Sequence, residues 1–307
     1  MVSQFNIAVF IALFFILNLT LIFNYYNFSI YGQTKDLENN NNIPKEVEVG
    51  DIKIAYKKFG NGDPILLIMG YSGSMNFWDP IFLDKLSANH TVIVFDNRGI
   101  GNTDAGTNNL TIDQFTQDTV GLLDALNISK SDILGYSMGG MIAQELTLKN
   151  SNKVDDLILY ATSCGGNKST LADQQVLNQL LNKSGSDEDK KKRWIPLQLT
   201  DEWIQENPGY MKKFVSIKYP SNKTLERQDK AIFDWFNLGV CDKLNNLSQD
   251  TLIITGTGDR VIPPQNSHLL ADKIPEALLV EIKGGGHKLM FQYPVEFSSK
   301  VMQFLEK

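Results

Sequence analysis

The chain has 307 residues, of which 42% are hydrophobic and 21% charged, and this composition excludes a disordered or collagen-like protein. The formal net charge of −6 and the absence of a long basic run argue against nucleic acid as a partner. Two cysteines and three histidines exclude a disulfide-rich scaffold and a cysteine-rich zinc site, so neither a metal ion nor a cofactor is expected.

Residues 7–23 (IAVFIALFFILNLTLIF) form an apolar run without a charge, and a helix of this length measures about 26 Å. A core helix that is apolar on every face does not suit an N-terminus, so residues 1–32 are predicted to be a signal peptide or a membrane anchor. An anchor is favoured because no basic side chain precedes the run and no clear cleavage site follows it. The rest of the chain would then lie outside the cytoplasm, at the membrane or exported.

Residues 33–44 (QTKDLENNNNIP) are predicted to be a disordered linker, because they combine an asparagine run with few apolar residues. A folded domain is therefore expected at residues 45–307. Asn-x-Ser/Thr sequons are more frequent than the roughly three expected by chance. They favour export, although an asparagine-rich chain can also collect them by coincidence. The nine sequons begin at Asn18, Asn27, Asn89, Asn109, Asn127, Asn167, Asn182, Asn222 and Asn246.

From residue 45 onward, strand patterns alternate with helical patterns. Residues 46–59 contain two alternating runs separated by Gly50-Asp51, which is typical of a β-hairpin. Continuous apolar runs follow, most of them before a helical pattern, and this order indicates an α/β fold with a mostly parallel sheet and helices on both faces. The predicted strands lie at residues 65–69, 91–95, 132–136, 154–160, 251–255 and 278–282.

Two features interrupt or mark this rhythm. A helix over residues 111–126 is predicted to begin with a capping box formed by Thr111 and Gln114. Residues from about 165 to 240 contain no strand signal, only polar helical stretches, and are predicted to be a helical cap inserted into the sheet domain. Cys164 and Cys241 flank this insertion and either close it with a disulfide or remain two buried thiols.

The segment Gly135-Tyr136-Ser137-Met138-Gly139 matches the pattern G-x-S-x-G, with a predicted strand before it and a helical pattern after it. In this context the pattern predicts a nucleophile elbow, a sharp turn that presents the serine oxygen at a helix N-terminus. The two glycines leave room for the turn. Ser137 is therefore the candidate nucleophile, against the alternative of a serine in an ordinary glycine-rich turn.

A serine hydroxyl is a weak nucleophile, so it needs a base that is oriented by an acid. His287 is the candidate base because it follows the last strand, at the carboxyl edge of the sheet. His90 precedes a strand, and His268 falls inside a helical pattern, so both are interpreted as structural or surface residues. Asp259 follows the strand at residues 251–255 and is the candidate acid, because acid precedes histidine in this type of fold.

An oxyanion hole needs two backbone N–H groups near the serine. One is expected from Met138, the residue after the nucleophile, and the other from Tyr71 in the loop after the strand at residues 65–69. Gly70 allows the backbone of this loop to turn in closely. On spacing alone, the segment is also compatible with a simple glycine-bearing loop.

With these motifs in order, the chain resembles the α/β-hydrolase superfamily over residues 46–307. Residues 135–140 (GYSMGG) are similar to its nucleophile elbow, and residues 96–103 (DNRGIGNT) resemble its D-x-R-G-x-G-x-S loop, with threonine as the last residue. Residues 255–264 and 284–287 resemble its acid and histidine loops. The resemblance implies the α/β-hydrolase fold and a serine-nucleophile enzyme of the esterase and lipase-like branch. Many members carry His-Gly at the oxyanion loop, where this chain has Met69.

Ser137 excludes the haloalkane dehalogenases and epoxide hydrolases of this superfamily, because they use an aspartate nucleophile. Met138 argues against a prolyl aminopeptidase, which typically has tryptophan there. The favoured hypothesis is a serine hydrolase that cleaves carboxylic esters through a Ser-His-Asp triad and an acyl-enzyme intermediate. The same triad could instead act on a lactone, an amide or a carbon–carbon bond, or catalyse perhydrolysis. A non-catalytic binding module is a third hypothesis, against which the complete triad argues.

Apolar residues in the loops and in the insertion indicate a pocket for a small ester or acyl substrate, although core packing explains about half of them equally well. The tryptophans of the insertion either cover the mouth of this pocket or form a core of the cap itself. No oligomeric state is indicated. The candidate substrate-binding residues are Met69, Met75, Phe77, Met141, Trp194, Trp203, Trp235 and Met290.

Overall fold

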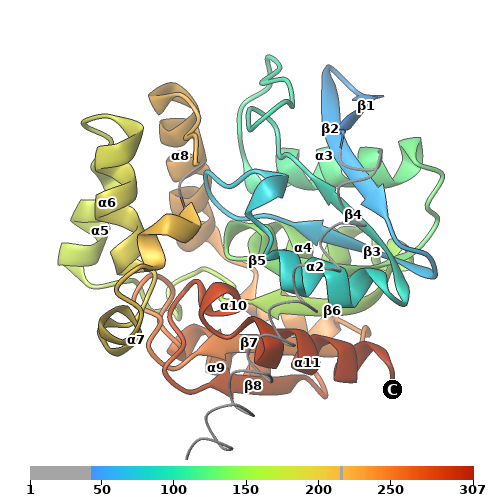
Figure 1. Cartoon of the computed structure of the whole chain (residues 1–307). Coiled ribbons are helices and arrows are strands. Elements are labelled where there is room, and N and C mark those ends of the chain that lie inside the picture. The colour runs from blue at the N-terminus through green and yellow to red at the C-terminus, as the bar shows by residue number, and fades with distance from the viewer. Residues whose placement is uncertain (1–42, 215–216) are drawn as a thin grey trace, which may run out of the picture. The chain divides into compact units, whose positions relative to one another are not determined.

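An eight-stranded sheet forms the centre of residues 44–307 (Figure 1). The computed structural model describes residues 43–214 and 217–307, so the predicted anchor or signal segment at 1–32 and the linker residues 33–42 lie outside the described residues. Among the residues described, no helix has the length and hydropathy needed to span a bilayer. The strands are β1 (Lys45–Val49), β2 (Ile52–Phe59), β3 (Asp63–Ile68), β4 (His90–Phe95), β5 (Ser131–Tyr136), β6 (Val154–Tyr160), β7 (Thr251–Gly256) and β8 (Leu278–Ile282).

The strands lie in the order β1-β2-β4-β3-β5-β6-β7-β8. The predicted hairpin is confirmed, because β1 and β2 pair antiparallel on either side of Gly50-Asp51. The β2–β4 pair is also antiparallel, and every pair from β4 to β8 is parallel. Parallel strands end at the same edge of a sheet, so the loops after β3, β5, β6, β7 and β8 meet at one edge.

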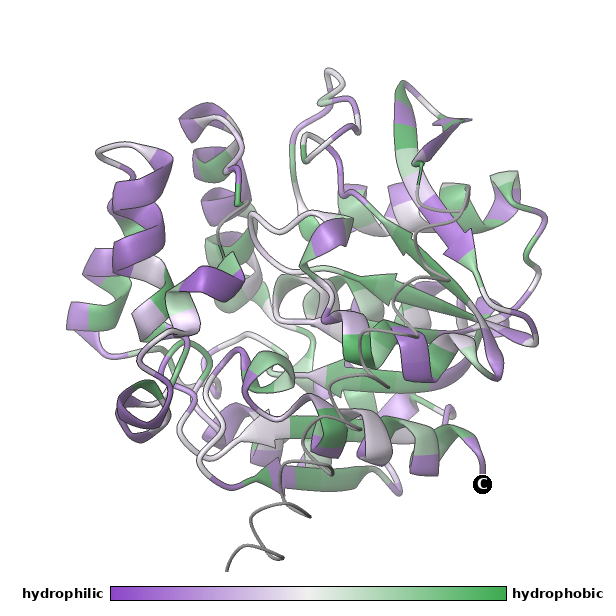
Figure 2. Cartoon of the chain, in the orientation of Figure 1, coloured by the Kyte–Doolittle hydropathy of each residue, from purple (hydrophilic) through white to green (hydrophobic). Residues whose placement is uncertain are grey.

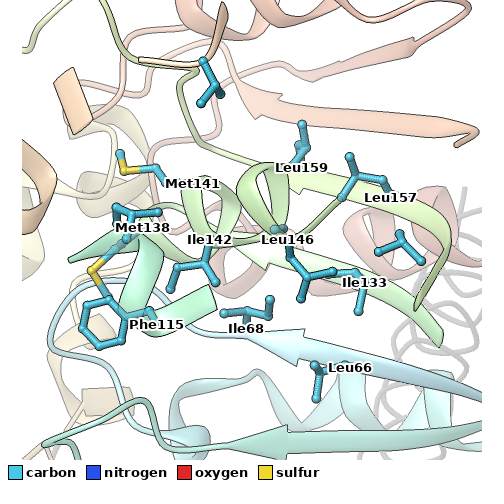
Figure 3. Close-up of a cluster of buried hydrophobic side chains, with 14 of the residues drawn as sticks. Leu66, Ile68, Phe115, Ile133, Met138, Met141, Ile142, Leu146, Leu157 and Leu159 are labelled. Carbon is cyan, nitrogen blue, oxygen red and sulfur yellow. The ribbon is translucent and has the colours of Figure 1, made fainter. Parts of the chain in front are cut away.

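Helices cover both faces of this sheet, as predicted for an α/β fold. Residues of α3 and α4 pack on one face with Leu66 and Ile68 of β3 (Figure 3), and α9 contributes Leu270 to the same cluster. Residues of α2 and α11 pack on the other face with Ile65 and Leu67. This division follows from the alternation of side chains along a strand. The helices are α2 (Pro80–Ser87), α3 (Ile112–Ala125), α4 (Met138–Lys149), α9 (Gln265–Lys273), α10 (Leu289–Gln292) and α11 (Pro294–Leu305), with 3-10 turns η1 (Met75–Phe77) and η2 (Ser151–Lys153).

The capping box predicted at the N-terminus of α3 forms only in part. The side chain of Thr111 accepts a hydrogen bond from the Gln114 N–H at 3.0 Å, as a helix N-cap does. The amide of Gln114 does not return to Thr111 but donates to Asp118 at 3.0 Å. Asp118 binds the buried Arg98, whose Nε and Nη2 lie 2.7 and 2.6 Å from its oxygens, so Gln114 completes a buried charged cluster instead of a capping box.

Residues 165–240 contain helices and no strand in their described part, as predicted for a cap. Hydrophilic residues are prominent on α6, whereas hydrophobic residues gather on the central strands (Figure 2). The helices α5, α6 and α8 stand together beside the sheet (Figure 1). This region contains α5 (Gln174–Leu181), α6 (Asp187–Leu197), α7 (Asp201–Glu206), η3 (Tyr210–Phe214) and α8 (Asn222–Leu238), and η4 (Cys241–Asn246) follows it.

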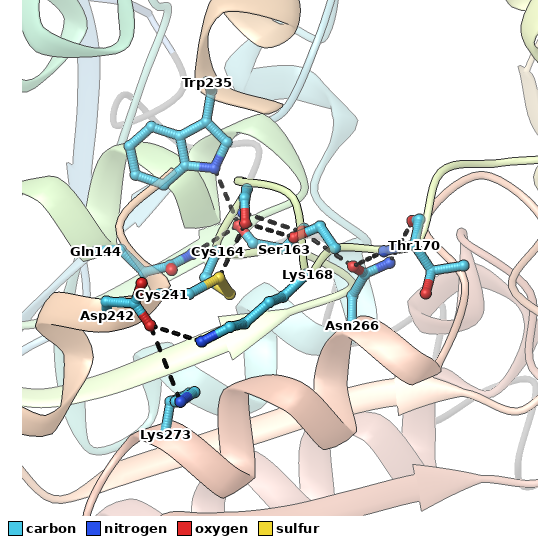
Figure 4. Close-up of a disulfide and its surroundings, with 12 residues drawn as sticks. Gln144, Ser163, Cys164, Lys168, Thr170, Trp235, Cys241, Asp242, Asn266 and Lys273 are labelled. Carbon is cyan, nitrogen blue, oxygen red and sulfur yellow. Dashed lines mark hydrogen bonds and ion pairs between the residues drawn. A yellow bond between two sulfur atoms is a disulfide. The ribbon is translucent and has the colours of Figure 1, made fainter. Parts of the chain in front are cut away.

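A disulfide joins Cys164 and Cys241 at the base of this region, with 5.0 Å between their Cα atoms (Figure 4). Of the two alternatives compatible with the sequence, the structure therefore has the paired one. The Val240 N–H donates to the Cys164 carbonyl at 2.8 Å, and the indole N–H of Trp235 donates to the Ser163 carbonyl at 3.1 Å. The two chain segments that enter and leave the cap are thus held to each other.

Asp132 lies at the start of β5, at the edge of the sheet opposite to the carboxyl ends of the parallel strands, and other carboxylates lie near it. Burial, opposed by a hydrogen bond from the Asp156 N–H, raises the pKa of Asp132 to about 6, and the charges of Asp156, Asp155 and Asp63 add to the rise. A carboxyl with a raised folded-state pKa destabilises the fold once it ionises. The penalty is absent below its ordinary pKa of 3.8 and complete above about 6.

Replacing Asp132 with asparagine is therefore expected to stabilise the protein at neutral pH. The amide oxygen can still accept the hydrogen bond from Asp156, while the buried charge is lost. We expect the free energy of unfolding to rise by about 1–2 kcal/mol at pH 7, less than the full pKa shift implies because the carboxyl is only partly buried. Urea unfolding at pH 7 and pH 4 measures this. An equal gain at both pH values would contradict the electrostatic explanation.

Candidate active site

Ser137 lies in the sharp turn between β5 and α4. Its backbone has φ 55° and ψ −117°, a left-handed conformation that a side chain rarely adopts. The flanking glycines make the turn possible, because a Cβ at Gly135 would lie 2.4 Å from the Gly139 carbonyl oxygen, and one at Gly139 would lie 2.0 Å from the Ile68 oxygen. The helix N-terminus therefore packs directly on the sheet, with the serine at its tip.

His287 connects Ser137 to Asp259 through two hydrogen bonds. Its Nε2 lies 3.0 Å from Ser137 Oγ, and its Nδ1 lies 2.8 Å from Asp259 Oδ2. The carboxylate can only accept, so we assign the proton to Nδ1, which leaves the lone pair of Nε2 for the serine hydroxyl. The structure thus brings together the three residues that the sequence pattern predicts to act as nucleophile, base and acid.

Further hydrogen bonds hold Asp259 and His287 in this orientation. The second oxygen of Asp259, Oδ1, accepts hydrogen bonds from the N–H groups of Val261 and Ile262 at 2.8 and 2.9 Å, and the side chain is completely buried. The hydroxyl of Tyr160 donates to the His287 carbonyl at 2.8 Å. Both groups of the pair are therefore fixed from sides that do not face the serine.

The loop after β3 approaches the serine closely. A Cβ at Gly70 would lie 3.0 Å from the Ser137 Cβ, so only glycine permits this approach. Within the described chain, neither the Tyr71 N–H nor the Met138 N–H has a hydrogen-bond acceptor. Two unsatisfied amide donors next to a serine can stabilise an oxyanion, as the spacing predicts for these two residues.

Two buried side chains hold this loop in place. The Asn97 amide donates to the Met69 carbonyl at 2.9 Å. The Oε1 of Gln228, a fully buried residue of cap helix α8, accepts from the Ser72 N–H at 2.9 Å, where Ser72 has a φ of 59°. The position of the loop therefore depends on the cap as well as on the sheet. The sequence contains no local signal for either contact, because both join distant segments.

The other two histidines lie outside the site. His90 is the first residue of β4, at the sheet edge opposite to the serine. His268 lies on α9, where its half-exposed side chain is 3.2 Å from Glu281. Across residues 43–214 and 217–307, no group of three or more His, Cys, Asp or Glu residues is placed to hold a metal ion. These positions agree with the interpretation of both histidines as structural or surface residues.

A mainly apolar cavity of about 150 Å³ opens onto Ser137 and His287. It is lined both by loops of the sheet domain and by the cap. Four of the predicted substrate-binding residues, Met69, Phe77, Met141 and Trp194, belong to its wall, together with Tyr71. Trp194 is placed by a hydrogen bond from its indole N–H to the Gln179 carbonyl at 2.9 Å.

The other four predicted substrate-binding residues do not line the cavity, and the prediction is corrected for each. Met75 and Met290 point into the core beneath the sheet, where they are 2% and 0% exposed. Trp203 packs with Ile195, Leu199 and Phe214 in a small core of the cap itself. Trp235 packs at the base of the cap, beside the disulfide (Figure 4), where its indole N–H donates to the Ser163 carbonyl. Sequence position places a residue near a site, but not the direction of its side chain.

Several residues that line the cavity were not predicted from the sequence. The helix α5 supplies three leucines, and the spacing of three and four between its apolar residues is the pattern of an amphipathic helix. Lys288, directly after the histidine, also belongs to the wall. No local pattern indicates that this lysine is buried. The missed apolar residues of the cap are Leu171, Ala172, Leu177, Leu180, Leu181, Ile195, Ile232, Phe233 and Phe236.

Comparisons with known proteins show the family to which this fold belongs. A family model described as alpha/beta hydrolase fold matches residues 63–294. A Mycobacterium tuberculosis protein provisionally named non-heme bromoperoxidase BpoC is 28% identical over 276 residues, which cover 82% of this chain and 97% of that protein. A protein of Azorhizobium caulinodans, provisionally named carbamate hydrolase RutD, is 26% identical and covers 83% of this chain and 96% of its own length.

Solved structures show the same fold. The meta-cleavage product hydrolase from Pseudomonas fluorescens IP01 is 26% identical, with a TM-score of 0.69 over 87% of this chain and 99% of that one. The enol-lactonase from Burkholderia xenovorans LB400 is 21% identical, with a TM-score of 0.75 over 86% of this chain and 100% of that one. At this identity the second likeness concerns the fold alone.

Proposed function

The chain belongs to the α/β-hydrolase family, and on this premise we propose that it is a serine hydrolase that cleaves carboxylic esters. One observation carries the proposal, namely the continuous hydrogen-bonded series Ser137–His287–Asp259 at the end of an apolar cavity. In the proposed roles, Ser137 is the nucleophile, His287 the general base and Asp259 the residue that orients the base.

In the proposed mechanism, the Ser137 Oγ attacks the ester carbonyl while its proton passes to His287 Nε2. The carboxylate of Asp259 stabilises the imidazolium that forms. Negative charge develops on the carbonyl oxygen and is stabilised by the N–H groups of Tyr71 and Met138. These N–H groups need no reorganisation, because they donate no hydrogen bond within the described chain. His287 then donates its proton to the leaving alkoxide, and an acyl-enzyme remains.

Water completes the proposed cycle. His287 accepts a proton from a water molecule, which attacks the acyl-enzyme, and the proton is then returned to Ser137. The apolar wall formed by Met141, Trp194 and the cap leucines favours a hydrocarbon acyl group over a polar one. The same steps can open a lactone, and the named activities of the relatives make lactone, carbamate and carbon–carbon hydrolysis the second group of candidates for a substrate panel.

We also propose the division of the chain that the sequence predicts. It consists of an anchor or signal segment at 1–32, a linker at 33–44, and a hydrolase domain at 45–307 with its cap at about 165–240. The disulfide supports a domain outside the cytoplasm, because such bonds persist in oxidising compartments. Alkaline extraction of membranes that contain the full chain tests the anchor, since an anchored protein stays in the pellet.

Substitution of the proposed nucleophile tests the function directly. We expect Ser137→Ala and His287→Ala each to lower kcat for p-nitrophenyl butyrate by about 10⁴- to 10⁶-fold, because each removes a participant in every bond-forming step. The exposed His268 provides a matched control, and His268→Ala should retain wild-type kcat. Circular dichroism checks the fold of each variant. A Ser137→Ala enzyme with kcat within tenfold of wild type would overturn the proposal.

Gln228 is a positioning residue for the oxyanion loop, and its role can be separated from binding. In Gln228→Leu the Ser72 N–H loses its buried acceptor, and the loop shifts away from its place beside Ser137. We expect kcat to fall by about tenfold, with KM changed less than threefold, because the oxyanion forms only in the transition state. Gln228→Glu, which keeps an acceptor oxygen, should recover part of kcat. A change confined to KM would refute this role.

The cavity wall on α8 is expected to select acyl chain length. Phe233 lines the cavity although it is 41% exposed, so Phe233→Ala removes apolar contact with little loss of stability. We expect kcat/KM for an octanoate ester, relative to acetate, to fall by about fourfold to tenfold. Leu238 lies on the same helix, is 83% exposed and does not line the cavity, so Leu238→Ala should leave the ratio unchanged. If the octanoate-to-acetate ratio of kcat/KM were the same in both variants, Phe233 would have no role in chain-length selection.

A further inference from the structure

The cavity wall contains a lysine that the proposed reaction does not use. Lys288 follows His287 in the chain, and the two Cα atoms are thus about 3.8 Å apart. The residue is only 5% exposed, and it lines the cavity. In the described ranges of the chain, its Nζ donates no hydrogen bond and forms no ion pair, whereas most other buried charged side chains here have a partner of opposite charge.

Three aromatic rings surround the ammonium group instead. Its Nζ lies 5.4 Å from the ring centre of Phe77, 5.9 Å from that of Phe214 and 5.3 Å from that of Phe291. These rings come from a loop of the sheet domain, from the cap and from α10, so the lysine lies where three parts of the domain meet. The ring faces attract a cation, but they accept none of its three N–H bonds in the manner of an oxygen.

Burial without a counter-ion is costly for a lysine. Desolvation lowers the pKa of Lys288 to about 8, so the group is still mainly protonated at pH 7. The cation–π contacts offset part of the cost, at about 0.5–2 kcal/mol each. An unused cation with free N–H donors at the wall of a binding cavity is satisfied when an anion enters.

The other charged groups of the cavity wall would not repel an anion bound at Lys288. Asp229 also lines the wall, but it forms an ion pair with Lys183, so its negative charge is neutralised. The rest of the wall is mainly apolar, apart from the site residues and polar groups such as Gln198 and Tyr219. Lys288 is therefore the charged residue of the wall that has no counter-charge within the described chain.

We propose that Lys288 binds a carboxylate of the substrate, so that the enzyme hydrolyses esters of which the acyl or alcohol part carries an acid group. The inference rests on the proposed function and narrows its substrate class. A carboxylate is favoured over a phosphate because a single ammonium inside an aromatic enclosure offers one positive charge and three donors, which match a monoanion. The substrate then spans the cavity, with its ester at Ser137 and its acid group at Lys288.

Paired substrates test this assignment. We compare kcat/KM for mono-p-nitrophenyl adipate with that for p-nitrophenyl hexanoate, and kcat/KM for 4-acetoxybenzoate with that for phenyl acetate, using the full chain. For at least one pair, we expect Lys288→Met to lower the ratio of anionic to neutral ester by about 10- to 100-fold relative to wild type. Lys288→Arg, which keeps the charge, should retain most of the ratio.

Lys213 provides the matched control. It is an exposed lysine of the cap near Trp203 and does not line the cavity, so Lys213→Met should keep both ratios within threefold of wild type. Lys288→Gln serves as a second neutral variant if Lys288→Met does not fold. Equal losses for both members of each pair in the neutral variants would show a structural lysine and overturn the assignment.

A binding measurement separates this inference from the proposed function. Calorimetry of the Ser137→Ala protein is expected to show adipate binding that is weakened at least tenfold by adding Lys288→Met, with hexanamide as the neutral probe. If Ser137→Ala retained hydrolysis, the proposed function would fail, while loss of adipate binding with Lys288 would still support the carboxylate site. Adipate binding that does not depend on Lys288 would overturn the site even in an active hydrolase.

Discussion

The two hydrogen bonds of the His287 ring connect parts of the chain that are far apart in sequence. Ser137 is 150 residues before this histidine, and Asp259 is 28 residues before it. The three residues meet because β5, β7 and β8 are parallel and end at one edge of the sheet. Each of the other features of the site, the oxyanion loop, the cavity and the cap, is arranged around this meeting point.

The cap does more than cover the serine. Through Gln228 it holds the backbone of the loop after β3, and through α5 and α8 it supplies much of the apolar wall. Phe214 of the cap also completes the aromatic enclosure of Lys288. Much of the apolar wall and the hydrogen-bonded series Ser137–His287–Asp259 thus lie on different parts of the chain. Changes in the cap can alter specificity while the hydrogen-bonded series of the sheet domain stays in place.

Much of the fold and the positions of Ser137, Asp259 and His287 could be predicted, because their signals are local. A continuous apolar run predicts a buried strand, and a reactive residue directly after it lies at the carboxyl edge. The substrate-side residues could not be predicted in this way. Met75 of η1 and Met290 of α10 lie near the site in the chain, but their side chains are buried in the core, and Trp235 supports the base of the cap. Lys288 has no local sequence signal for its burial, since two of the three rings around it, Phe77 and Phe214, are far from it in the chain.

The disulfide between Cys164 and Cys241 changes what a break in the cap would do. The exposed turn at residues 182–186 between α5 and α6 is the kind of site at which proteases cut. A cut there would leave two fragments, one ending in the cap and one beginning in it, that remain covalently joined across the base. Ser137 would lie on the first fragment, and Asp259 and His287 on the second. The bond would keep all three in one molecule, so a nicked enzyme could persist as a two-chain form that separates only under reducing conditions.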